Sequence, residues 1–489
     1  MHSNNKLETF IENPKRALWK LTIPMMLGLF VNSIYMLVDT FFVGSKIGSN
    51  ALSALGYVMP FYFIVMGITF GLSSGATAVI AQYIGKQDKL NADQSAQNSL
   101  VIATIMAIIN LLFVYFFGER VLASQNMSLD VLGLAMEYFY VMAYGSIFLI
   151  YGIFLRSILV GEGESIIPMA ALGIGTIMNI FLDPFFIEYW GIKGAAYATV
   201  VSQIFVVLIF VFFIFIRKSI YLDLSFSKFK IDFKIWRKIF NIGVPGSLSM
   251  LIMSIGLFIM NYILTDSSSA YVAAYSLANR LENFIILALV SLSTSQVTIV
   301  GMFYGAKRFD LIKPIVNYTT IWSIIITLFF SIISFLFIEN IIPYFTIPKD
   351  EFKLAIEENA GKQYLDIEKY SKYDLNDDQY ITSEDLEVRQ QTIDSTVSYY
   401  KVMAFIFPFI GITMVSTRSL QGIGMGTPML MVAISRVLII QCILAFVFIK
   451  IWDKPIIWAW YAIAISCIAS SIIAYSLRLY FLSKLTFNK

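Results

Sequence analysis

Long apolar runs separated by short polar segments dominate this sequence. A helix that crosses a membrane needs about 20 apolar residues, and runs of that size predict about twelve such helices. We expect them near residues 21–44, 55–84, 98–117, 138–160, 166–187, 194–216, 241–264, 273–304, 314–338, 398–422, 427–449 and 457–483. The predicted fold class is therefore an all-α polytopic membrane protein.

Lysine and arginine residues in the connections predict the topology. Cytoplasmic loops of membrane proteins are enriched in these residues. One alternate set of connections holds clusters such as Lys15, Arg16 and Lys20, and the other set holds isolated residues such as Arg120 and Lys193. We therefore expect a multi-pass protein of the plasma membrane, the inner membrane of the cell, with both termini in the cytoplasm.

The two halves of the chain repeat. Pro24 in TIPMMLGL corresponds to Pro245 in GVPGSLSM, and YIGKQD corresponds to FYGAKRFD at nearly the same offset. LRSILVGEGESIIP from Leu155 resembles TRSLQGIGMGTP from Thr417 in the same way. Internal repeats of this kind are typical of transporters, whose halves move against each other around a central site. We predict two lobes of six helices each.

A basic segment, RKSIYLDLSFSKFKIDFKIWRKIFN, connects these halves. We expect an amino-terminal lobe over residues 1–216, a cytoplasmic linker over 217–240 and a carboxyl-terminal lobe over 241–489. Lysines that alternate with Phe and Ile are typical of a segment on an anionic membrane surface. A solvated connector has the same composition, so both interpretations stay open.

Composition narrows the function classes. The chain is 58% hydrophobic and 14% charged, whereas soluble proteins are about 25% charged. His2 is the only histidine, which excludes most metal-site and histidine-based catalytic schemes. Cys442 and Cys467 lie in apolar runs and imply no disulfide framework. We expect no enzymatic activity, no resident cofactor, no nucleic-acid partner and a monomer in the lipid bilayer.

The first predicted helix carries a carboxylate, Asp39. At the centre of a bilayer an aspartate costs roughly 2.5–3.5 kcal/mol, so it usually faces the protein interior or a cavity and has a function. Tyr35 lies one turn earlier on the same helix face. A position near the membrane interface is the alternative, because Gly44, Ser45 and Lys46 follow closely.

The fifth and sixth predicted helices carry further oxygen ligands. Asn179 and Asp183 are four residues apart and share a helix face, as do Thr199 and Gln203. Two carboxylates with hydroxyl and amide oxygens suit a hard monovalent cation, or a proton if the carboxylates lie close together. Glu188 follows soon after, so a position of Asp183 at the outer interface is the alternative.

The segments IPMMLGLFVNSIYMLVDTFFVG and NIFLDPFF, with the Gly-Glu-Gly before Pro168, resemble the multidrug and toxic compound extrusion (MATE) transporters. The resemblance implies two lobes of six helices, a V-shaped cavity open to the outside, and export of cationic aromatic drugs in exchange for Na⁺ or H⁺. It implies a coupling-cation site at Asp39, Asn179, Asp183 and Thr199, with Tyr35 beside it. The seventh helix lacks the glutamate found in some branches, which argues against a second cation site.

Three charged residues lie inside predicted helices of the second half. Arg280 and Glu282 in SLANRLENFII are predicted to neutralise each other near the interface, and the alternative is that they gate the cavity. Arg436 in VAISRVLII is predicted to contact carbonyl or carboxylate groups between helices, or to help hold an inner gate. In the first half of the chain, Gln203 of the sixth predicted helix is a further candidate for the lining of the cavity.

An acidic insert occupies residues 346–397. Within it, DLNDDQYITSED at 374–385 has the oxygen spacing of a calcium loop and resembles an EF-hand or dockerin repeat. The predicted ligands are Asp374, Asn376, Asp378, Tyr380 and Asp385. Gln379 replaces the usual turn glycine, and an acidic loop without calcium is the alternative.

The predicted function is a secondary active antiporter that exports organic cations in exchange for Na⁺ or H⁺ by alternating access. Many methionines and phenylalanines, 21 and 42 respectively, provide adaptable apolar surface for varied aromatic substrates. A flippase for a lipid-linked sugar or precursor is the alternative, for which we expect a more cationic cavity. A calcium-sensing membrane receptor fits the repeated two-half plan less well.

Overall fold

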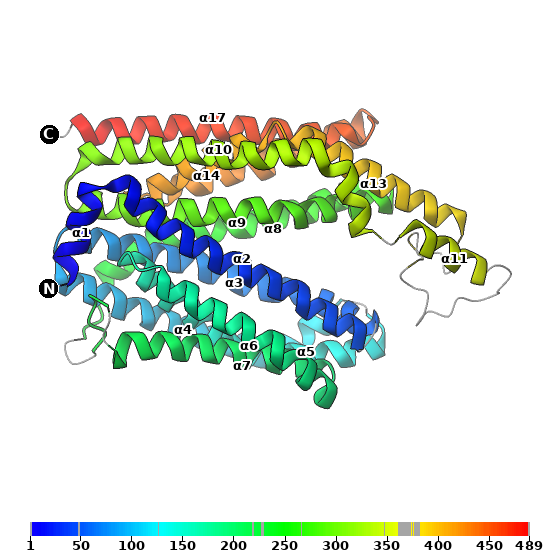
Figure 1. Cartoon of the computed structure of the whole chain (residues 1–489), viewed down its shortest axis with the longest axis horizontal. Coiled ribbons are helices and arrows are strands. Elements are labelled where there is room, and N and C mark those ends of the chain that lie inside the picture. Colours follow the sequence, from blue (N-terminus) through cyan, green and yellow to red (C-terminus); the bar gives the residue numbers. More distant parts are fainter. Residues whose placement is uncertain are drawn as a thin grey trace.

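The computed structural model is helical along nearly all of its length (Figure 1). It describes residues 2–46, 49–125, 127–217, 220–225, 229–265, 267–346, 348–359, 373, 375 and 382–487. Within these ranges, the side chains at 2–6, 35–41, 43–50, 52, 130, 349, 358–359 and 486–487 are outside the description.

The first half of the chain forms α1 (His2–Glu12), α2 (Pro14–Lys46), α3 (Ser49–Gly85), α4 (Lys89–Ala123), α5 (Leu129–Gly161), α6 (Ile166–Trp190), α7 (Ile192–Val211) and the π-helical turn η1 (Phe212–Ile216). The second half begins with α8 (Phe233–Thr265), α9 (Ser269–Gly305), α10 (Phe309–Ile341), η3 (Ile342–Phe345) and α11 (Lys349–Asn359). It continues with α13 (Ser383–Met403), α14 (Phe407–Gly422), α15 (Thr427–Ala433), η4 (Ile434–Cys442), α16 (Ile443–Phe446), η5 (Val447–Ile451) and α17 (Ile457–Phe487).

The described residues hold 11 helices that are long and apolar enough to cross a membrane, or 12 if α13 and α14 form one span bent by 59°. The prediction of about twelve helices is thereby confirmed. The predicted tenth helix, 398–422, runs across this bend. Its first part, α13, begins much earlier, at Ser383, because Thr382 and Asp385 form a capping box in the polar sequence of the insert.

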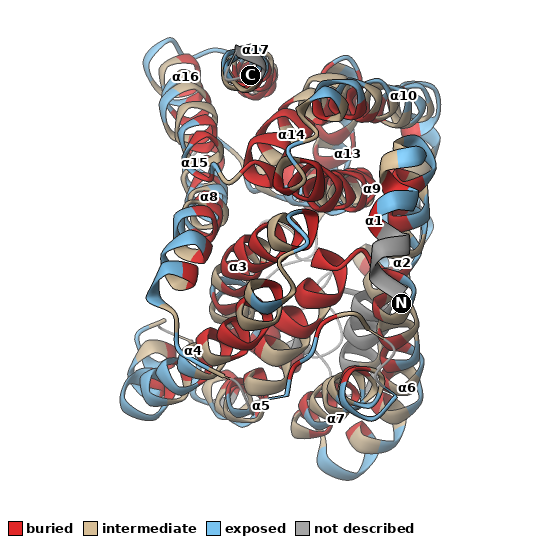
Figure 2. Cartoon of the chain, turned by 90° about the vertical axis from the view of Figure 1, so that its left-hand side faces the viewer, coloured by how far each residue is buried: buried red, intermediate tan, exposed pale blue. Residues whose placement is uncertain are grey.

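The helices form two bundles, α2–α7 and α8–α17 (Figure 1). Both chain termini lie at one end of the molecule, which we call the terminal end. Across the boundary between the bundles, α3 contacts α8 and α9, and α2 contacts α9. Figure 2, viewed from the terminal end, shows buried residues where α3 faces α9 and α14. The two predicted lobes are therefore present and are packed together there.

Two glycines bring the lobes into backbone contact at the terminal end. A Cβ atom at Gly85 of α3 would lie 2.0 Å from the carbonyl oxygen of Met302 in α9. A Cβ atom at Gly305 of α9 would lie 2.0 Å from the carbonyl oxygen of Gln82 in α3. These glycines belong to the repeated segments YIGKQD and FYGAKRFD, so each half of the repeat supplies one side of the contact.

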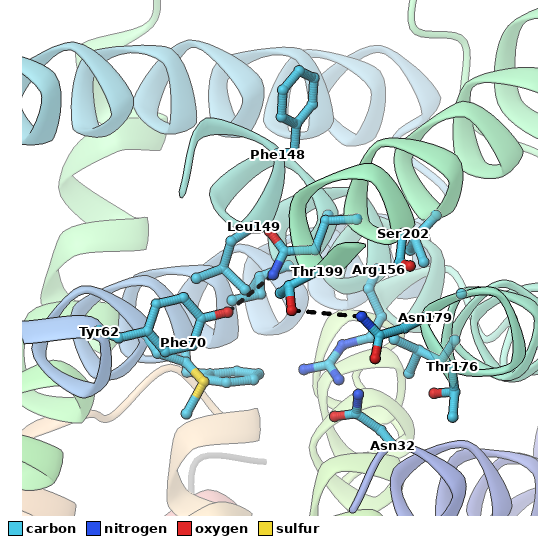
Figure 3. Close-up of a pocket in the computed structure, with 17 residues that line it drawn as sticks. Asn32, Tyr62, Phe70, Phe148, Leu149, Arg156, Thr176, Asn179, Thr199 and Ser202 are labelled. Atoms are coloured by element: carbon cyan, nitrogen blue, oxygen red, sulfur yellow. Dashed lines mark hydrogen bonds between the residues drawn. The ribbon is translucent and has the colours of Figure 1, made fainter. Parts of the chain in front are cut away.

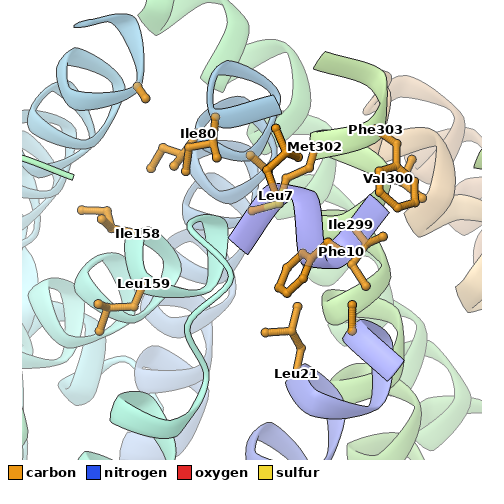
Figure 4. Packing of buried hydrophobic residues seen from close by; sticks show 14 of the residues in the cluster. Leu7, Phe10, Leu21, Ile80, Ile158, Leu159, Ile299, Val300, Met302 and Phe303 are labelled. Carbon is orange, nitrogen blue, oxygen red and sulfur yellow. The ribbon is translucent and has the colours of Figure 1, made fainter. Parts of the chain in front are cut away.

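Helix α1 covers this contact. Leu7 and Phe10 are each only 4% exposed and belong to a buried apolar cluster with Ile80 of α3 and Ile299 and Met302 of α9 (Figure 4). Burial of large apolar side chains stabilises each by about 1.5–3 kcal/mol. The amino terminus therefore joins both lobes.

The described part of the linker packs on the amino-terminal lobe. Leu222 and Leu224 are buried in the cluster that also contains α1. The Glu162 carboxylate, from the Gly-Glu-Gly segment, accepts hydrogen bonds from the backbone N–H groups of Tyr221 and Leu222 at 3.1 and 3.2 Å. Helix α8 begins at Phe233, inside the predicted linker. These contacts tie the described part of the linker to the amino-terminal lobe.

We predict that Gly85→Ala destabilises the protein by about 1–3 kcal/mol, because the added methyl group would force α3 away from the backbone of α9. Thermal unfolding of the purified protein measures this. Gly56→Ala is the control, because nothing lies within 4 Å of a Cβ atom at Gly56 in the same helix. Equal unfolding temperatures for the two variants would contradict the proposed contact.

Candidate functional site

A cavity of about 160 Å³ opens inside the amino-terminal lobe (Figure 3). Its polar and aromatic lining residues come from α2, α3, α5, α6 and α7 and are Asn32, Tyr62, Phe70, Phe148, Arg156, Thr176, Asn179, Thr199, Ser202 and Gln203. Pockets for drug-sized ligands are roughly 300–1,000 Å³. The cavity is smaller than this range.

Asp183, Asn179 and Thr199 lie together beside this cavity. The Asp183 side chain is 0% exposed. Asn179 Nδ2 lies 3.3 Å from Asp183 Oδ1 and 3.5 Å from Thr199 Oγ1. With the amide turned over, the nitrogen donates to Asp183 Oδ2 at 3.0 Å and the oxygen accepts from the Thr199 backbone N–H at 3.2 Å. In either orientation the amide connects α6 to α7 next to a buried carboxylate.

Two further hydroxyl groups belong to this oxygen-rich region and were missed by the sequence interpretation. Thr176 Oγ1 and Ser202 Oγ are buried, and neither has a hydrogen-bond partner within the described part of the chain. Thr176 precedes Asn179 by three residues and Ser202 follows Thr199 by three, so each lies one turn away on a similar face. That spacing is the signal that could have identified them. Carboxylate, amide and hydroxyl oxygens together fit a hard cation.

The remaining predicted residues of this lobe divide into two groups. Gln203 lines the cavity and donates a hydrogen bond from Nε2 to the Tyr62 hydroxyl at 3.0 Å. Helix α2 includes Tyr35 and Asp39, but the structure does not describe their side chains. Their place in the cation site stays a prediction.

The predicted pairing of Arg280 with Glu282 is wrong. Arg280 is exposed and lines a cavity between α9 and α13, whereas Glu282 is 8% exposed. Residues two apart on a helix point to different faces, so these side chains diverge. Glu282 instead accepts a hydrogen bond from the Tyr399 hydroxyl at 2.6 Å.

Arg436 lies near this buried carboxylate and interacts with it electrostatically. It belongs to the π-helical segment η4, a type of turn that is common at functional sites. Among the described residues, no hydrogen-bond acceptor contacts its Nε. A partner between helices and a role in an inner gate both stay predictions for Arg436.

The predicted calcium loop is only partly described. Asp374, Asn376, Asp378 and Tyr380 are outside the described residues. The Asp385 carboxylate is 0% exposed and accepts hydrogen bonds from the backbone N–H groups of Leu375 and Thr382 at 2.7 and 2.9 Å. Asp385 therefore helps to cap the start of helix α13, and calcium binding stays a prediction. Elsewhere in the described ranges, no group of three or more His, Cys, Asp or Glu side chains could hold a metal.

Comparison with known families decides the identity. The family model described as MatE matches residues 24–185 and again residues 245–366. This chain belongs to the MATE family. The two matches begin at Pro24 and Pro245, the prolines that the sequence comparison paired.

Two bacterial proteins resemble this chain over more than half of its length. The probable multidrug resistance protein YoeA of Bacillus subtilis is 24% identical over 360 residues, which cover 70% of this chain and 76% of YoeA. The multidrug export protein MepA of Staphylococcus saprophyticus is 25% identical over 308 residues, which cover 62% and 68% of the two chains.

Solved structures show the same fold. A MATE structure in the bent conformation has a TM-score of 0.84 at 24% identity, covering 99% of this chain and 98% of the other. A second structure was described under the words "Reverse polarity of binding pocket suggests different function of a MOP superfamily transporter from Pyrococcus furiosus Vc1". Its TM-score is 0.85 at 25% identity, and the alignment covers 99% of both chains.

We predict that Tyr399→Phe lowers the free energy of unfolding by about 1–3 kcal/mol, because it leaves the buried Glu282 carboxylate without its hydroxyl donor. Thermal or denaturant unfolding in detergent measures the change. Tyr344→Phe is the control, since Tyr344 is 88% exposed. A Tyr399→Phe protein as stable as this control would show that the hydrogen bond contributes little.

Proposed function

We propose that this MATE protein is a secondary active antiporter that exports aromatic organic cations in exchange for Na⁺ or H⁺. The observation that carries the proposal is the fully buried Asp183 carboxylate, connected through Asn179 to Thr199 beside a cavity in the amino-terminal lobe. The relatives named as multidrug resistance and multidrug export proteins support drug efflux.

Coupling follows from the energetics of this carboxylate. An ionised group removed from water is costly unless a cation or proton neutralises it. Asp183 and Asp39 would take up the coupling ion, and the hydroxyl group of Thr199, which lies near Asn179, would supply a further oxygen. An ion bound beside the cavity stabilises the state that has released the drug, because ion and substrate then bind the same lobe in competition.

Alternating access would be a movement of one lobe against the other. The contacts of α3 with α8 and α9 join the lobes at the terminal end, where we place the cytoplasm. Opening towards the cytoplasm would require these contacts, and the packing of α1 over them, to separate.

A flippase for a lipid-linked precursor is the second candidate. Arg156 lines the amino-terminal cavity, and a cationic lining suits a phosphate group. Within the same fold, this observation favours an anionic cargo.

We predict that Asp183→Asn and Asp39→Asn each abolish ion-driven export, because an amide cannot take up a proton and binds a cation more weakly. Ethidium export from proteoliposomes under separately imposed Na⁺ and H⁺ gradients measures this and names the coupling ion. Asp350→Asn is the control, since Asp350 is exposed on α11 outside the cavity. Wild-type export by both Asp183→Asn and Asp39→Asn would refute the proposed coupling site.

We further predict weak calcium binding by the acidic insert, with a Kd of about 10⁻⁴–10⁻³ M, as in extracellular calcium modules. Isothermal titration of the full-length protein with calcium measures it. The double variant Asp374→Asn with Asp378→Asn should lose the binding heat, and Asp350→Asn should keep it. No binding heat at millimolar calcium in the wild-type protein would leave the insert as a simple acidic loop.

A further inference from the structure

Arg156 of α5 is the one charged side chain among the described residues that line the amino-terminal cavity. Figure 3 shows it among the labelled lining residues, in the region of Asn32 and Asn179. Its guanidinium carbon lies 5.0 Å from the centre of the Phe70 ring. This contact is a cation–π interaction and leaves the N–H groups available to a ligand.

The same arginine also faces the boundary between the lobes. A smaller cavity of about 50 Å³ is lined by Arg156, Met25, Thr77 and Thr294, which come from α5, α2, α3 and α9. Arg156 therefore lies where the amino-terminal cavity approaches the carboxyl-terminal lobe. A molecule that moves between the lobe boundary and the cavity would pass this side chain.

The internal repeat supplies a comparison within the chain. The Arg-Ser pair at Arg156 corresponds to the pair at Arg418 of α14. Arg418 Nη1 donates a hydrogen bond to Gln421 Oε1 at 2.9 Å, and Gln421 Nε2 donates to Ser74 Oγ at 2.7 Å. In the second half the arginine thus serves packing between lobes. Within the described residues, Arg156 has no corresponding acceptor.

Arg156 is partly exposed to the cavity that it lines, so an acceptor that enters this cavity can reach its N–H groups. Its planar arrangement of donors matches carboxylate and phosphate groups. We propose that Arg156 binds a carboxylate or phosphate group of the transported molecule, while the aromatic or apolar part of that molecule packs on Phe70 and Phe148. This inference rests on the export function proposed above and selects a class of substrate for it.

The class that fits both proposals is an amphipathic molecule that carries an anionic group as well as an aromatic or cationic part. The oxygen groups of Asn179 and Thr199 lie on the same cavity as Arg156. A zwitterion can therefore place its two charges at different parts of the wall. A simple cation offers no acceptor to Arg156, so it should bind more weakly than such a zwitterion.

A matched pair of dyes tests this inference. Rhodamine B carries a free carboxylate and is a zwitterion, and its ethyl ester is a cation of nearly the same shape. Fluorescence anisotropy with the full-length protein in detergent gives the Kd of each. We expect wild-type protein to bind the acid more tightly, and Arg156→Gln to weaken binding of the acid at least about tenfold while leaving the ester unchanged or tighter.

Two further variants serve as controls for the binding assay. Arg156→Lys should retain part of the preference for the acid, because it keeps the charge and loses the planar donor arrangement. Arg120→Gln, at an exposed arginine of α4, should bind both dyes as the wild type does. No preference in the wild-type protein, or an equal loss of both dyes in Arg156→Gln, would overturn the inference.

Competition distinguishes the two sources of the anionic group. Farnesyl phosphate that displaces rhodamine B where farnesol does not would indicate a lipid-linked phosphate. Failure of both to compete would indicate a soluble carboxylate-bearing substrate. The binding assay uses no ion gradient, so absent ion-driven export would refute the antiporter proposal and leave the dye result standing. Equal ion-driven export of the ester by the wild-type protein and Arg156→Gln, without any preference for the acid in the binding assay, would overturn the role of Arg156. The antiporter proposal would then stand.

Discussion

Close packing of α3 against α8 and α9 is the contact on which the rest of this structure depends. Neighbouring helices in a membrane gain little from excluding water, so they associate through small residues that let their backbones approach. Gly71 and Gly75 of α3 meet the backbone of α8, as Gly85 meets that of α9. The two lobes are thereby joined at the terminal end. Farther along, each lobe can surround its own polar groups.

Polar groups are distributed differently in the two lobes. The amino-terminal lobe places Asp183 with amide and hydroxyl oxygens next to a cavity. In the carboxyl-terminal lobe, Glu282 is enclosed by Tyr399 and lies near Arg436, within an apolar cluster. A carboxylate that already accepts a hydrogen bond from a hydroxyl group on another helix is suited to holding helices together. A carboxylate next to a cavity, such as Asp183, is suited to binding an ion.

The two halves of the chain share repeated segments, and corresponding residues in these segments have either kept or changed their contacts. Corresponding arginines, Arg156 and Arg418, face a cavity in one half and a glutamine in the other. The corresponding glycines Gly85 and Gly305 keep the same role, because both are needed for the helices to approach. A duplicated fold therefore retains the residues that its architecture requires. The binding groups are free to differ between the halves.

The sequence by itself determined the fold class, the number of membrane helices and the repeat, because each depends on local apolar length or on direct comparison of segments. It also paired Asn179 with Asp183, since four residues along a helix bring side chains to one face. The divergence of Arg280 and Glu282 also follows from the sequence, because residues two apart on a helix point to different faces. Only the tertiary structure decided that Tyr399 reaches Glu282 and that Arg156 lines the cavity. These contacts join helices far apart in the chain, and helical periodicity defines a face without saying which helix will lie opposite it.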